Sequence, residues 1–592
     1  MWPYKFPLLI SIGTAMSIIL SACGGKTSTK DDEAFFAPAT KGTVTEDAFD
    51  RERLLQISLQ MPANDFARLR SEGRPLNTAL GACQSSDFEY SDFKALANID
   101  GQTLENVAIR KKGFLGSLSR TRPSIKLNFD THEEGRTFKT LKRMTLNNDR
   151  QDPSHTHQCM AYDLFRAAGL VAPRCNLAHV YINGEDLGIY SHVESIKKPF
   201  LERNFGNKSG NLYEAQVADF GSQLNQRFEL KTNKKTNKKT NNRSDLDDLA
   251  NVLKLTDDEF LTQIRQHIDV DEFINFWSVE TLIGHWDSAT GNTNNYYMYH
   301  NPDDGLFHFI PWGTDSTFTK GHPFKPNSAP LYKNLSLAKR LYDIAETRNQ
   351  YFSTINELLT ENWVEEDLIS QLEKIQQLTL NSKDNYNEVT EFINGNDELG
   401  EKSQRELLTS AIAGEVNQTA YILPDQAINC SNDTTSLTAE FSSNGDQGSF
   451  SFTDAEGIQR TASMSIVSNY TNVDSFVYQL DQTTSPSVVG LTFIGAATPP
   501  YYPDSYVLQV FVEKPDYKKG QLSLHGISTN IMLFKVIDKD STPAKIELIS
   551  AGHSGSIKLS ETGVGVEGSI IEGEINAQMG LIKTIDYIKT DY

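Results

Sequence analysis

The segment from Gly284 to Phe318 constrains this chain more than any other stretch of its sequence. An apolar run from Phe307 to Trp312 follows an aromatic run across a turn, and this pattern predicts a β-hairpin. Asp287 and Asp315 stand at opposite ends of the predicted hairpin. A cluster of amide side chains lies just after the first aspartate: Asn292, Asn294 and Asn295.

The spacing within this segment indicates a kind of chemistry. Asp287 and Asn292 have the D-x-x-x-x-N spacing of a protein-kinase catalytic loop. Asp315 follows its apolar run as the magnesium-binding aspartate of a kinase follows a strand. We therefore expect chemistry on a nucleotide phosphate.

The beginning of the chain is interpreted as a targeting segment and not as part of the fold. Lys5 precedes an apolar run from Phe6 to Leu20, which matches a signal-peptide core and is short for a transmembrane helix. The run ends in the sequence LSAC, which resembles a lipobox. Residues 1–22 are thus predicted to be a lipoprotein signal peptide and Cys23 the lipid-modified residue. The alternative is an ordinary signal peptide with an incidental cysteine.

A lipidated Cys23 would anchor an exported protein to the cell envelope, and Gly24 after it is compatible with the outer membrane of a Gram-negative cell. No later stretch of the sequence is apolar enough to span a bilayer. Outside the cytoplasm the remaining cysteines can form disulfides, and three pairings are open. They lack CxxC spacing, which argues against structural zinc: Cys83, Cys159, Cys175 and Cys430.

Length and charge limit the remaining possibilities. A chain of 592 residues is too long for one hydrophobic core, so two or more domains are expected. The net charge of −21 argues against a nucleic-acid partner. Residues 23–50 are predicted to be a flexible tether and 51–425 one domain. The Ser-, Thr- and Gly-rich residues 430–592 are predicted to form an all-β, sandwich-like domain. A GxGxxG sequence over 563–568 lies amid strand patterns and is not interpreted as a dinucleotide site.

Local patterns place the main elements before residue 425. Asp100-Gly101 and Asn183-Gly184 each separate two alternating apolar runs, which predicts two hairpins. The tetrad repeat over 231–242 is interpreted as an expanded surface loop, with a basic patch for an anionic partner as the alternative. The other expected elements are strands over 54–59 and 124–129 and helices over 155–168, after 245 and over 335–423.

Five segments carry a distinctive pattern when they are taken in order. They are VAIRKKG with RPSIK (107–113, 122–126), LKRMTLNND with DPS (141–149, 152–154), VYINGEDLGIY with VE (180–190, 193–194), FL with GNLYE (200–201, 210–214), and the block over 287–318. Together they resemble the CotH family of atypical, secreted protein kinases. The resemblance implies an α+β fold: a kinase-like domain with a β-rich N-lobe, a helical C-lobe and ATP between them, followed by the all-β domain outside the match.

The resemblance implies roles for residues at matching positions. Asp287 matches the catalytic-loop aspartate, which orients or deprotonates the acceptor hydroxyl; the alternative is an aspartate that caps a turn. Asp315 matches the aspartate that binds magnesium or manganese with ATP. Asn292 and Asn295 are each expected to bind the metal through an amide oxygen, or else to form turns.

The same resemblance suggests side chains that bind the nucleotide. Lys126 lies in the strand where the family places lysines, and Lys112 beside Gly113 is placed to cover phosphates. Arg122 stands where the family has a lysine, to which an arginine is not equivalent. Glu194 is expected to contact nucleotide or to pair with a lysine. The alternatives are a solvated strand face for Lys126 and a structural ion pair for Glu194.

Gly313 departs from the pattern of many family members, which carry an aspartate there. One carboxylate is therefore missing, which leaves two-metal coordination open. His157 is interpreted as a packed or surface histidine. The expected function is an ATP- and magnesium-dependent transfer of phosphate to Ser or Thr hydroxyls of proteins in the cell envelope or outside the cell. The alternatives are an inactive kinase-like scaffold for surface assembly or adhesion, and transfer of another group such as a nucleotidyl group.

Overall fold

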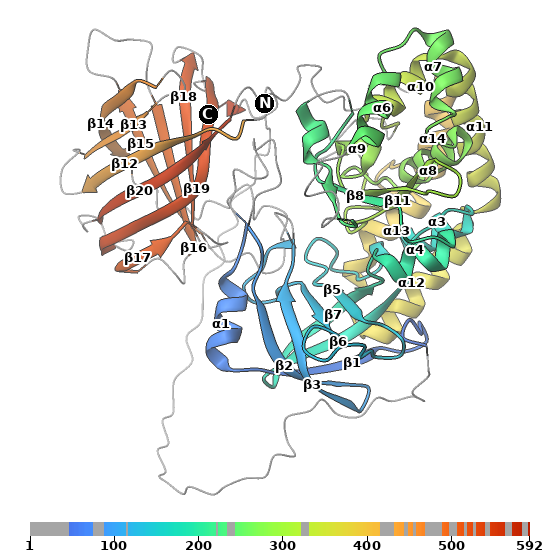
Figure 1. The fold of residues 1–592 in the computed structure, drawn as a ribbon, viewed down its shortest axis with the longest axis horizontal. Helices are drawn as coiled ribbons and strands as arrows, with labels where there is room; N and C mark the ends of the chain where they lie inside the picture. Colours follow the sequence, from blue (N-terminus) through green and yellow to red (C-terminus); the bar gives the residue numbers. More distant parts are fainter. Residues whose placement is uncertain are drawn as a thin grey trace, which may run out of the picture.

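The computed structural model describes most of residues 47–414 and parts of the chain from 431 to 591 (Figure 1). The predicted signal peptide, Cys23, the first part of the tether, most of the basic repeat and the GxGxxG sequence lie outside the described residues. Within those residues, none of the helices combines the length and the apolar character needed to cross a membrane. The described ranges are 47–74, 88–113, 117–220, 223–233, 243–320, 331–414, 431–442, 448–453, 457–467, 488–496, 506–513, 518–524, 529–538, 545–562, 571–582 and 590–591.

The first region is a closed β-barrel, drawn in blue to cyan in Figure 1. Its strand order is β1-β2-β3-β4-β5-β7-β6; in the described part of the chain all neighbours are antiparallel except β1 and β6. This parallel pairing closes the barrel. The strands are β1 (Leu55–Gln60), β2 (Asp92–Ile99), β3 (Gln102–Lys111), β4 (Ile125–Asn128), β5 (Arg143–Asn147), β6 (Cys175–Ile182) and β7 (Glu185–Val193).

Alternating side chains fill the barrel, as the sequence patterns predicted. Ile125 and Leu127 of β4 are fully buried inside, whereas Lys126 between them is half-buried on the outer face. Both predicted hairpins are confirmed, and the residues of their turns, Asp100-Gly101 and Asn183-Gly184, all have positive φ angles. Helix α1 (Ala63–Ser71) buries Phe66 and Leu69 against the same core.

Helix α3 (His157–Ala167) packs on β6 and β7 and is also joined to the barrel covalently. Cys159 of α3 and Cys175 of β6 form a disulfide, and both cysteines are buried. The sequence left the pairing open, and the structure selects this one. Cys83 and Cys430 lie outside the described residues.

The second region combines a small antiparallel sheet with helices, green to yellow in Figure 1. The sheet order is β11-β10-β8-β9, and β10 (Tyr296–His300) with β11 (Phe307–Pro311) forms the predicted hairpin. Helix α8 (Val270–Leu282) lies in the segment after residue 245 that was expected to be helical, and it buries aromatic residues at helical spacing, including Trp277. The other elements are β8 (Asn211–Ala215), β9 (Glu229–Leu230), α4 (Lys198–Phe205), α6 (Ser244–Val252), α7 (Asp257–Ile264), α9 (Ala289–Asn292), α10 (Ser336–Asp343), α11 (Ala345–Glu361), α12 (Glu365–Thr379), α13 (Asn387–Asn394) and α14 (Gln404–Ile412), with 3-10 turns at Gln223–Arg227 and Lys383–Tyr386.

The third region, orange to red in Figure 1, is all-β as predicted, but it is not a sandwich of two packed sheets. Its described strands form one antiparallel sheet, in which β20 pairs with both β12 and β19, so that the path through the sheet returns on itself. The reason lies in the long strand β19, whose register shifts near Gly552 and Leu559 let it follow β20 around this closure. The strands are β12 (Thr434–Ser442), β13 (Gly448–Thr453), β14 (Gln459–Val467), β15 (Val488–Ala496), β16 (Tyr506–Glu513), β17 (Gly520–Ser523), β18 (Thr529–Asp538), β19 (Lys545–Thr562), β20 (Ile571–Leu581) and β21 (Thr590–Asp591).

Candidate active site

Asp287 lies at the centre of a compact set of amides in the loop between α8 and β10. We call residues 287–295 the aspartate–amide loop. Asn292 Nδ2 donates to Asp287 Oδ1 at 2.8 Å, and Asn295 Nδ2 donates to Asp287 Oδ2 at 2.7 Å. Asn294 Nδ2 lies 3.2 Å from both carboxylate oxygens. Burial raises the pKa of Asp287 to about 6, although these amide donors oppose the shift.

The amide oxygens of the two predicted metal ligands point away from the Asp287 carboxylate, because the nitrogen of each amide is turned toward it. No hydrogen bond within the described ranges engages Asn292 Oδ1. Asn295 Oδ1 lies against the backbone of Gly313. Of these two amide oxygens, that of Asn292 is therefore better placed to accept a metal ion.

Asp315 follows β11, and its backbone is fixed by residues from elsewhere in the fold. His157 Nδ1 lies 2.9 Å from the Asp315 carbonyl oxygen, and Gln151 Nε2 donates to Ser316 Oγ at 3.2 Å. His157 is 3% exposed, so it is packed, as interpreted from the sequence, and supports the aspartate from behind. Burial raises the pKa of Asp315 to about 7; Lys112 lowers it, whereas Asp287 and Asp149 raise it further.

Gly313 has a structural reason to be a glycine. Its φ angle is +53°, a left-handed conformation that side chains disfavour. A Cβ atom at this position would lie 2.5 Å from Asn295 Oδ1. A side chain at position 313 would therefore have to displace the amide of Asn295.

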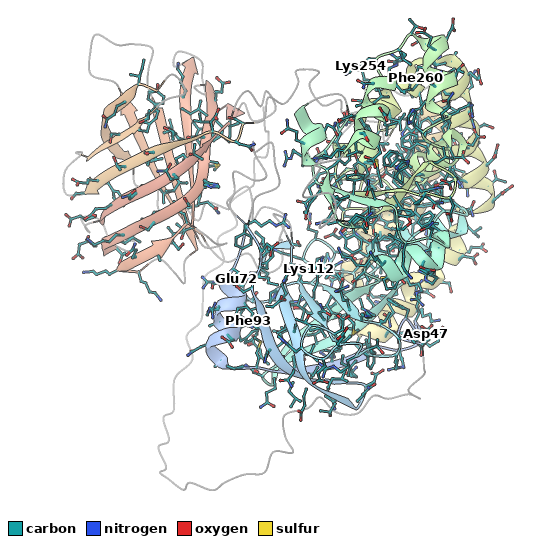
Figure 2. The ribbon with its side chains drawn as sticks, viewed as in Figure 1. Asp47, Glu72, Phe93, Lys112, Lys254 and Phe260 are labelled. Atoms are coloured by element: carbon teal, nitrogen blue, oxygen red, sulfur yellow. A yellow bond between two sulfur atoms is a disulfide. The ribbon has the colours of Figure 1, made fainter. Side chains whose placement is uncertain are left out.

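Lys112 is half-buried at the end of the barrel nearest the second region, as Figure 2 shows. Its ammonium group donates to Asn147 Oδ1 and lies 5.7 Å from the ring centroid of Trp312. Burial lowers its pKa to about 8, while the carboxylates of Asp315, Glu214 and Asp149 oppose the shift. The predicted phosphate-binding lysine is thus a neighbour of the predicted metal-binding aspartate.

Lys112 is one of four half-buried lysines that share the carboxylate of Glu214 as a neighbouring charge. We call them the lysine cluster: Lys112, Lys126, Lys197 and Lys231. Burial and neighbouring cations lower the pKa of Lys126 and of Lys197 to about 7. No hydrogen bond or ion pair joins either ammonium group to a residue in the described part of the chain. Burial opposes ionisation of Glu214, but Lys231, Lys126 and Lys197 outweigh it and hold the Glu214 pKa well below its usual range.

Lys231 corrects one prediction. It begins the tetrad repeat that was interpreted as a solvated loop, yet it is half-buried and paired with Glu214 and, at 2.6 Å, with Glu229. The reason is that it directly follows β9, whose pairing with β8 brings it beside Glu214. Residues 234–242 of the repeat lie outside the described residues.

Arg122 and Glu194 have structural partners. Arg122 lies over the Tyr190 ring, 5.3 Å from its centroid, and donates to the backbone oxygen of Ile189. Glu194 is 7% exposed and forms ion pairs with Arg174 at 2.9 Å and Arg203 at 2.5 Å. Both predicted nucleotide-binding side chains therefore have protein partners in the absence of a nucleotide.

The oxygen atoms of Asp315 and Asn292 fit a magnesium or manganese ion whose remaining ligands are waters and phosphate oxygens. Hard divalent cations prefer oxygen donors, and magnesium commonly keeps waters and phosphate oxygens beside one or two protein carboxylates. Asp315 and Asn292 Oδ1 supply such oxygens next to Asp287. The described residues contain no group of three or more His, Cys, Asp or Glu side chains that could hold a metal ion.

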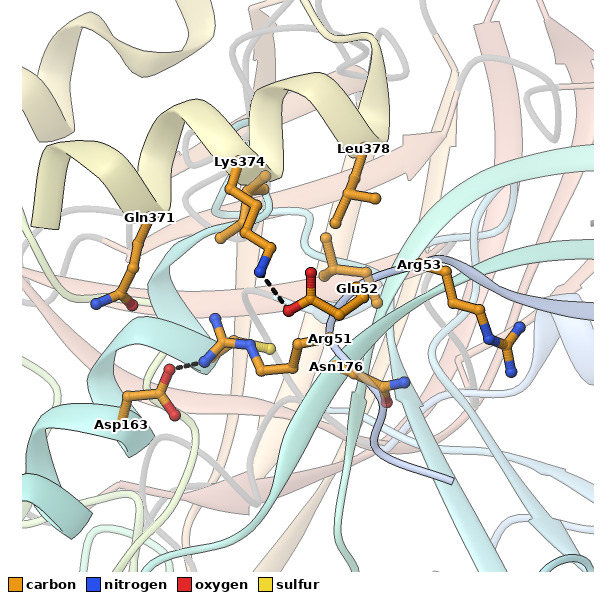
Figure 3. A pocket seen from close by; sticks show the side chains of 11 residues that line it. Arg51, Glu52, Arg53, Asp163, Asn176, Gln371, Lys374 and Leu378 are labelled. Carbon is orange, nitrogen blue, oxygen red and sulfur yellow. Dashed lines mark hydrogen bonds and ion pairs between the residues drawn. The ribbon is translucent and has the colours of Figure 1, made fainter. Parts of the chain in front are cut away.

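A cavity of about 310 Å³ lies apart from these residues, between the start of the barrel, α3, β6 and α12 (Figure 3). Four of its charged side chains are paired with one another, Arg51 with Asp163 and Glu52 with Lys374, and Arg53 pairs with Asp100 outside the cavity. Leu177, Ile375 and Leu378 contribute its apolar lining. Because none of the predicted site residues lines this cavity, it is not part of the candidate site.

Several residues of the site were not predicted from the sequence. Asp149 is 2% exposed, accepts a hydrogen bond from Gln158 Nε2 and lies 3.0 Å from His155 Nδ1. Glu214 and Asp149 end segments that carry the family resemblance, so their position there was an available signal. Lys197, in contrast, has no local pattern that separates it from a surface lysine.

Comparison with known proteins assigns the sequence to a family. The family described as CotH kinase protein matches residues 109–409, half of the chain, which include the lysines, the aspartate–amide loop and Asp315. The chain therefore belongs to the CotH family.

The chain is similar to curated members of that family. It is 23% identical over 271 residues to inner spore coat protein H of Bacillus subtilis, covering 43% of this chain and 74% of the relative. It is 25% identical over 233 residues to an inner spore coat protein H-like protein of the same organism, covering 38% and 64%. Spore coat protein homolog 1 of Rhizopus delemar is 20% identical over 195 residues, covering 31% and 32%.

Proposed function

We propose that this protein is a phosphotransferase that moves the terminal phosphate of ATP, with magnesium or manganese, to Ser or Thr hydroxyls of proteins. One observation carries the proposal. Half-buried Lys126 and Lys197 form no hydrogen bond or ion pair within the described residues, and Lys112 of the same cluster lies near Asp315, whose pKa is raised. A bound anion would stabilise the charged forms of Lys126 and Lys197, and a bound cation would stabilise the charged form of Asp315. A nucleotide polyphosphate with its metal ion supplies both at once.

The same proposal extends to the architecture. The barrel with Lys112 and Lys126 corresponds to a kinase-like N-lobe, and the region with the aspartate–amide loop and Asp315 corresponds to a C-lobe. In this arrangement ATP lies between the regions. Two charged residues support this position for ATP. Lys112 follows the end of β3 in the barrel, Asp315 follows β11 in the second region, and the two charges interact.

In the proposed reaction Asp287 acts on the acceptor. Its carboxylate accepts a hydrogen bond from the Ser or Thr hydroxyl and takes the proton as the hydroxyl oxygen bonds to the γ-phosphorus, while the bond from phosphorus to the bridging oxygen of ADP breaks. Asn292, Asn294 and Asn295 hold the carboxylate in place. Asp315 and Asn292 would hold a metal ion, which neutralises charge on the phosphates. Lys112 neutralises further phosphate charge.

The test uses purified protein with ATP, magnesium and a panel of exported protein acceptors. Label transfer and intact mass of the acceptor identify the group that is added, which separates phosphoryl from nucleotidyl transfer. Asp287→Ala and Asp315→Ala are expected to abolish transfer while circular dichroism remains unchanged. If the wild-type protein neither binds ATP with magnesium nor labels any acceptor, the proposal is lost.

A second candidate is a kinase-like scaffold for cell-surface assembly or adhesion. It is favoured by the Asp287 carboxylate, which is already saturated by amide donors, and by the missing carboxylate at Gly313. A double variant Asp287→Ala/Asp315→Ala with unchanged cellular function supports the scaffold. Loss of that function, with normal protein levels, supports the enzyme.

We also propose an exported, lipid-anchored location in the cell envelope. The LSAC sequence ending at Cys23 supports anchoring, the buried Cys159–Cys175 disulfide suits an oxidising compartment, and the names of the relatives describe spore coat proteins. Cys23→Ser is expected to move the protein from the membrane fraction to the soluble fraction. Metabolic labelling with a fatty acid that is unaffected by this substitution would contradict the proposal.

A further inference from the structure

Glu280 is a buried carboxylate that lies directly behind the aspartate–amide loop. It sits near the end of α8 and is 1% exposed. Oε2 accepts from Thr290 Oγ1 at 2.6 Å and from Thr290 N at 3.0 Å, and Oε1 accepts from Ala289 N at 3.2 Å. No ion pair joins Glu280 to a cation within the described ranges. The hydrogen bonds that its carboxyl oxygens accept therefore come from the loop itself.

The groups that bind Glu280 occupy the short stretch between Asp287 and Asn292. This stretch forms α9, and Ser288 before it caps the helix by accepting a hydrogen bond from Gly291 N at 3.0 Å. The carbonyl groups of the same stretch bind Asn334: Asn334 N donates to Thr290 O at 2.8 Å and Asn334 Nδ2 donates to Gly291 O at 2.6 Å. The loop is thus held by both Glu280 and Asn334.

Glu280 would lose more free energy than Asn334 if its hydrogen bonds to the loop were broken. A buried carboxylate without hydrogen-bond donors is strongly unfavourable, so the structure must keep the Ala289 and Thr290 donors where they are. A loop that moved away would leave the charge unsatisfied. Burial raises the pKa of Glu280 to about 7, against the Thr290, Ser288 and Ala289 donors, which is consistent with a carboxylate that depends on those few groups.

We infer that Glu280 is a positioning residue that fixes the distance and orientation between Asp287 and Asn292. The inference rests on the proposed function, since it assigns the acceptor-binding aspartate and the metal-binding amide to the two ends of the segment that Glu280 holds. Glu280 itself touches neither of these side chains in the structure. It acts through the backbone and hydroxyl of Thr290.

The test compares full-length wild-type protein with Glu280→Ala, Glu280→Gln and Thr290→Val. Glu280→Gln keeps one oxygen acceptor and places an NH2 group against a backbone N–H, whereas Thr290→Val removes only the hydroxyl donor. Glu346→Gln, an exposed change on α11, is the matched control. Hydrogen exchange is measured for peptides covering 286–296, and kcat and KM for ATP are measured with a labelled acceptor.

We expect exchange in 286–296 to accelerate about tenfold or more in Glu280→Ala and less in Glu280→Gln and Thr290→Val, with the control unchanged. The variants should lose about 10- to 100-fold in kcat with KM for ATP changed less than about threefold, because misplacement acts on the chemical step. If Glu280→Ala does not fold, Glu280→Gln and Thr290→Val decide.

If the wild type is active, two results overturn the inference: exchange in 286–296 that matches the wild type in all variants, or a faster-exchanging loop with unchanged kcat. The exchange measurement needs no activity, so it also separates this inference from the proposed function. The wild type could show no transfer although exchange in 286–296 depends on Glu280. That result would confirm that Glu280 holds the loop and would overturn its positioning role in catalysis.

Discussion

The side-chain amide of Asn295 occupies the space that a side chain at Gly313 would need. A Cβ atom at position 313 would lie 2.5 Å from Asn295 Oδ1 and 2.6 Å from its Cγ atom. Asn295 also holds Asp287 through Nδ2, so the conformation of the 312–315 segment and that of the aspartate–amide loop depend on one another.

Gly313→Ala is therefore expected to destabilise the protein more than a change at a glycine with open surroundings. Gly305 provides the control, because its φ angle is +76° and a Cβ atom at that position would have nothing within 4 Å. We expect a loss of about 1 kcal/mol in the free energy of unfolding for Gly305→Ala and ~2–4 kcal/mol for Gly313→Ala, measured by urea denaturation. Equal losses would show that Asn295 can move aside freely.

Gly313→Asp should consequently not create a second metal-binding carboxylate. We expect it to displace Asn295, to weaken its bond to Asp287 and to lower any transfer activity by about tenfold or more. The measurement is the transfer rate over a magnesium titration. A variant with a higher rate or tighter magnesium binding would contradict the expectation.

Asp315→Asn should stabilise the free protein at alkaline pH. The pKa of Asp315 is raised to about 7, so between about pH 4 and pH 7 the folded state holds a proton that the unfolded state has released. The contribution of Asp315 to stability thus falls as pH rises through this window. We expect the variant to melt several degrees higher than the wild type at pH 8, with no difference at pH 4, by differential scanning fluorimetry without metal. The opposite order would contradict the raised pKa.

Lys126→Met and Lys197→Met should weaken the binding of nucleotide without metal by about 10- to 100-fold, because each removes a charged donor to phosphate. The pKa of both lysines is lowered to about 7 in the free protein, so binding an anion above that pH requires proton uptake. Affinity should therefore fall from pH 7 to pH 9, and calorimetry in buffers of different ionisation enthalpy should reveal the uptake. Lys198→Met, an exposed neighbour, serves as the control; an equal loss there would point to general charge effects.

Removal of the Cys159–Cys175 disulfide by Cys159→Ala/Cys175→Ala should cost about 3 kcal/mol, because the two cysteines are 16 residues apart and the bridge restricts the unfolded chain. Both cysteines are buried, so a mild reductant should not reduce the disulfide of the folded wild type during the measurement. Thermal melting of the variant beside the wild type, each with and without reductant, measures both effects. A variant as stable as the wild type would exclude a stabilising role.

Local patterns predicted the elements whose folding is decided locally. The Asn183-Gly184 turn and the alternation around Ile125 and Leu127 were sufficient for a hairpin and a strand. The closure of the barrel was not predictable, because β1 pairs with a strand more than one hundred residues later and no local pattern encodes a partner. The C-terminal sheet was taken for a sandwich for the same reason: β12 and β20 lie at opposite ends of that region.

The candidate site divides in the same way. Asp287 and its amides share one loop, so spacing alone brought them together, and Asp315 follows from the hairpin. Lys197 and Glu280 become part of the site only through packing between distant elements. Glu280 lies in the helix expected after residue 245, but its contact with Thr290 depends on how the loop turns back on α8.

The parallel pairing of β1 with β6 also bears on how the protein would carry mechanical load. The polypeptide enters the barrel at Leu55, and β1 is bonded to β2 on one side and to β6 on the other. Tension applied at the amino-terminal end would act along β1 and load both rows of hydrogen bonds in shear, so that they resist together and not one after another. A chain tethered at that end to a moving surface would transmit the pull into a strand that is bonded on both sides.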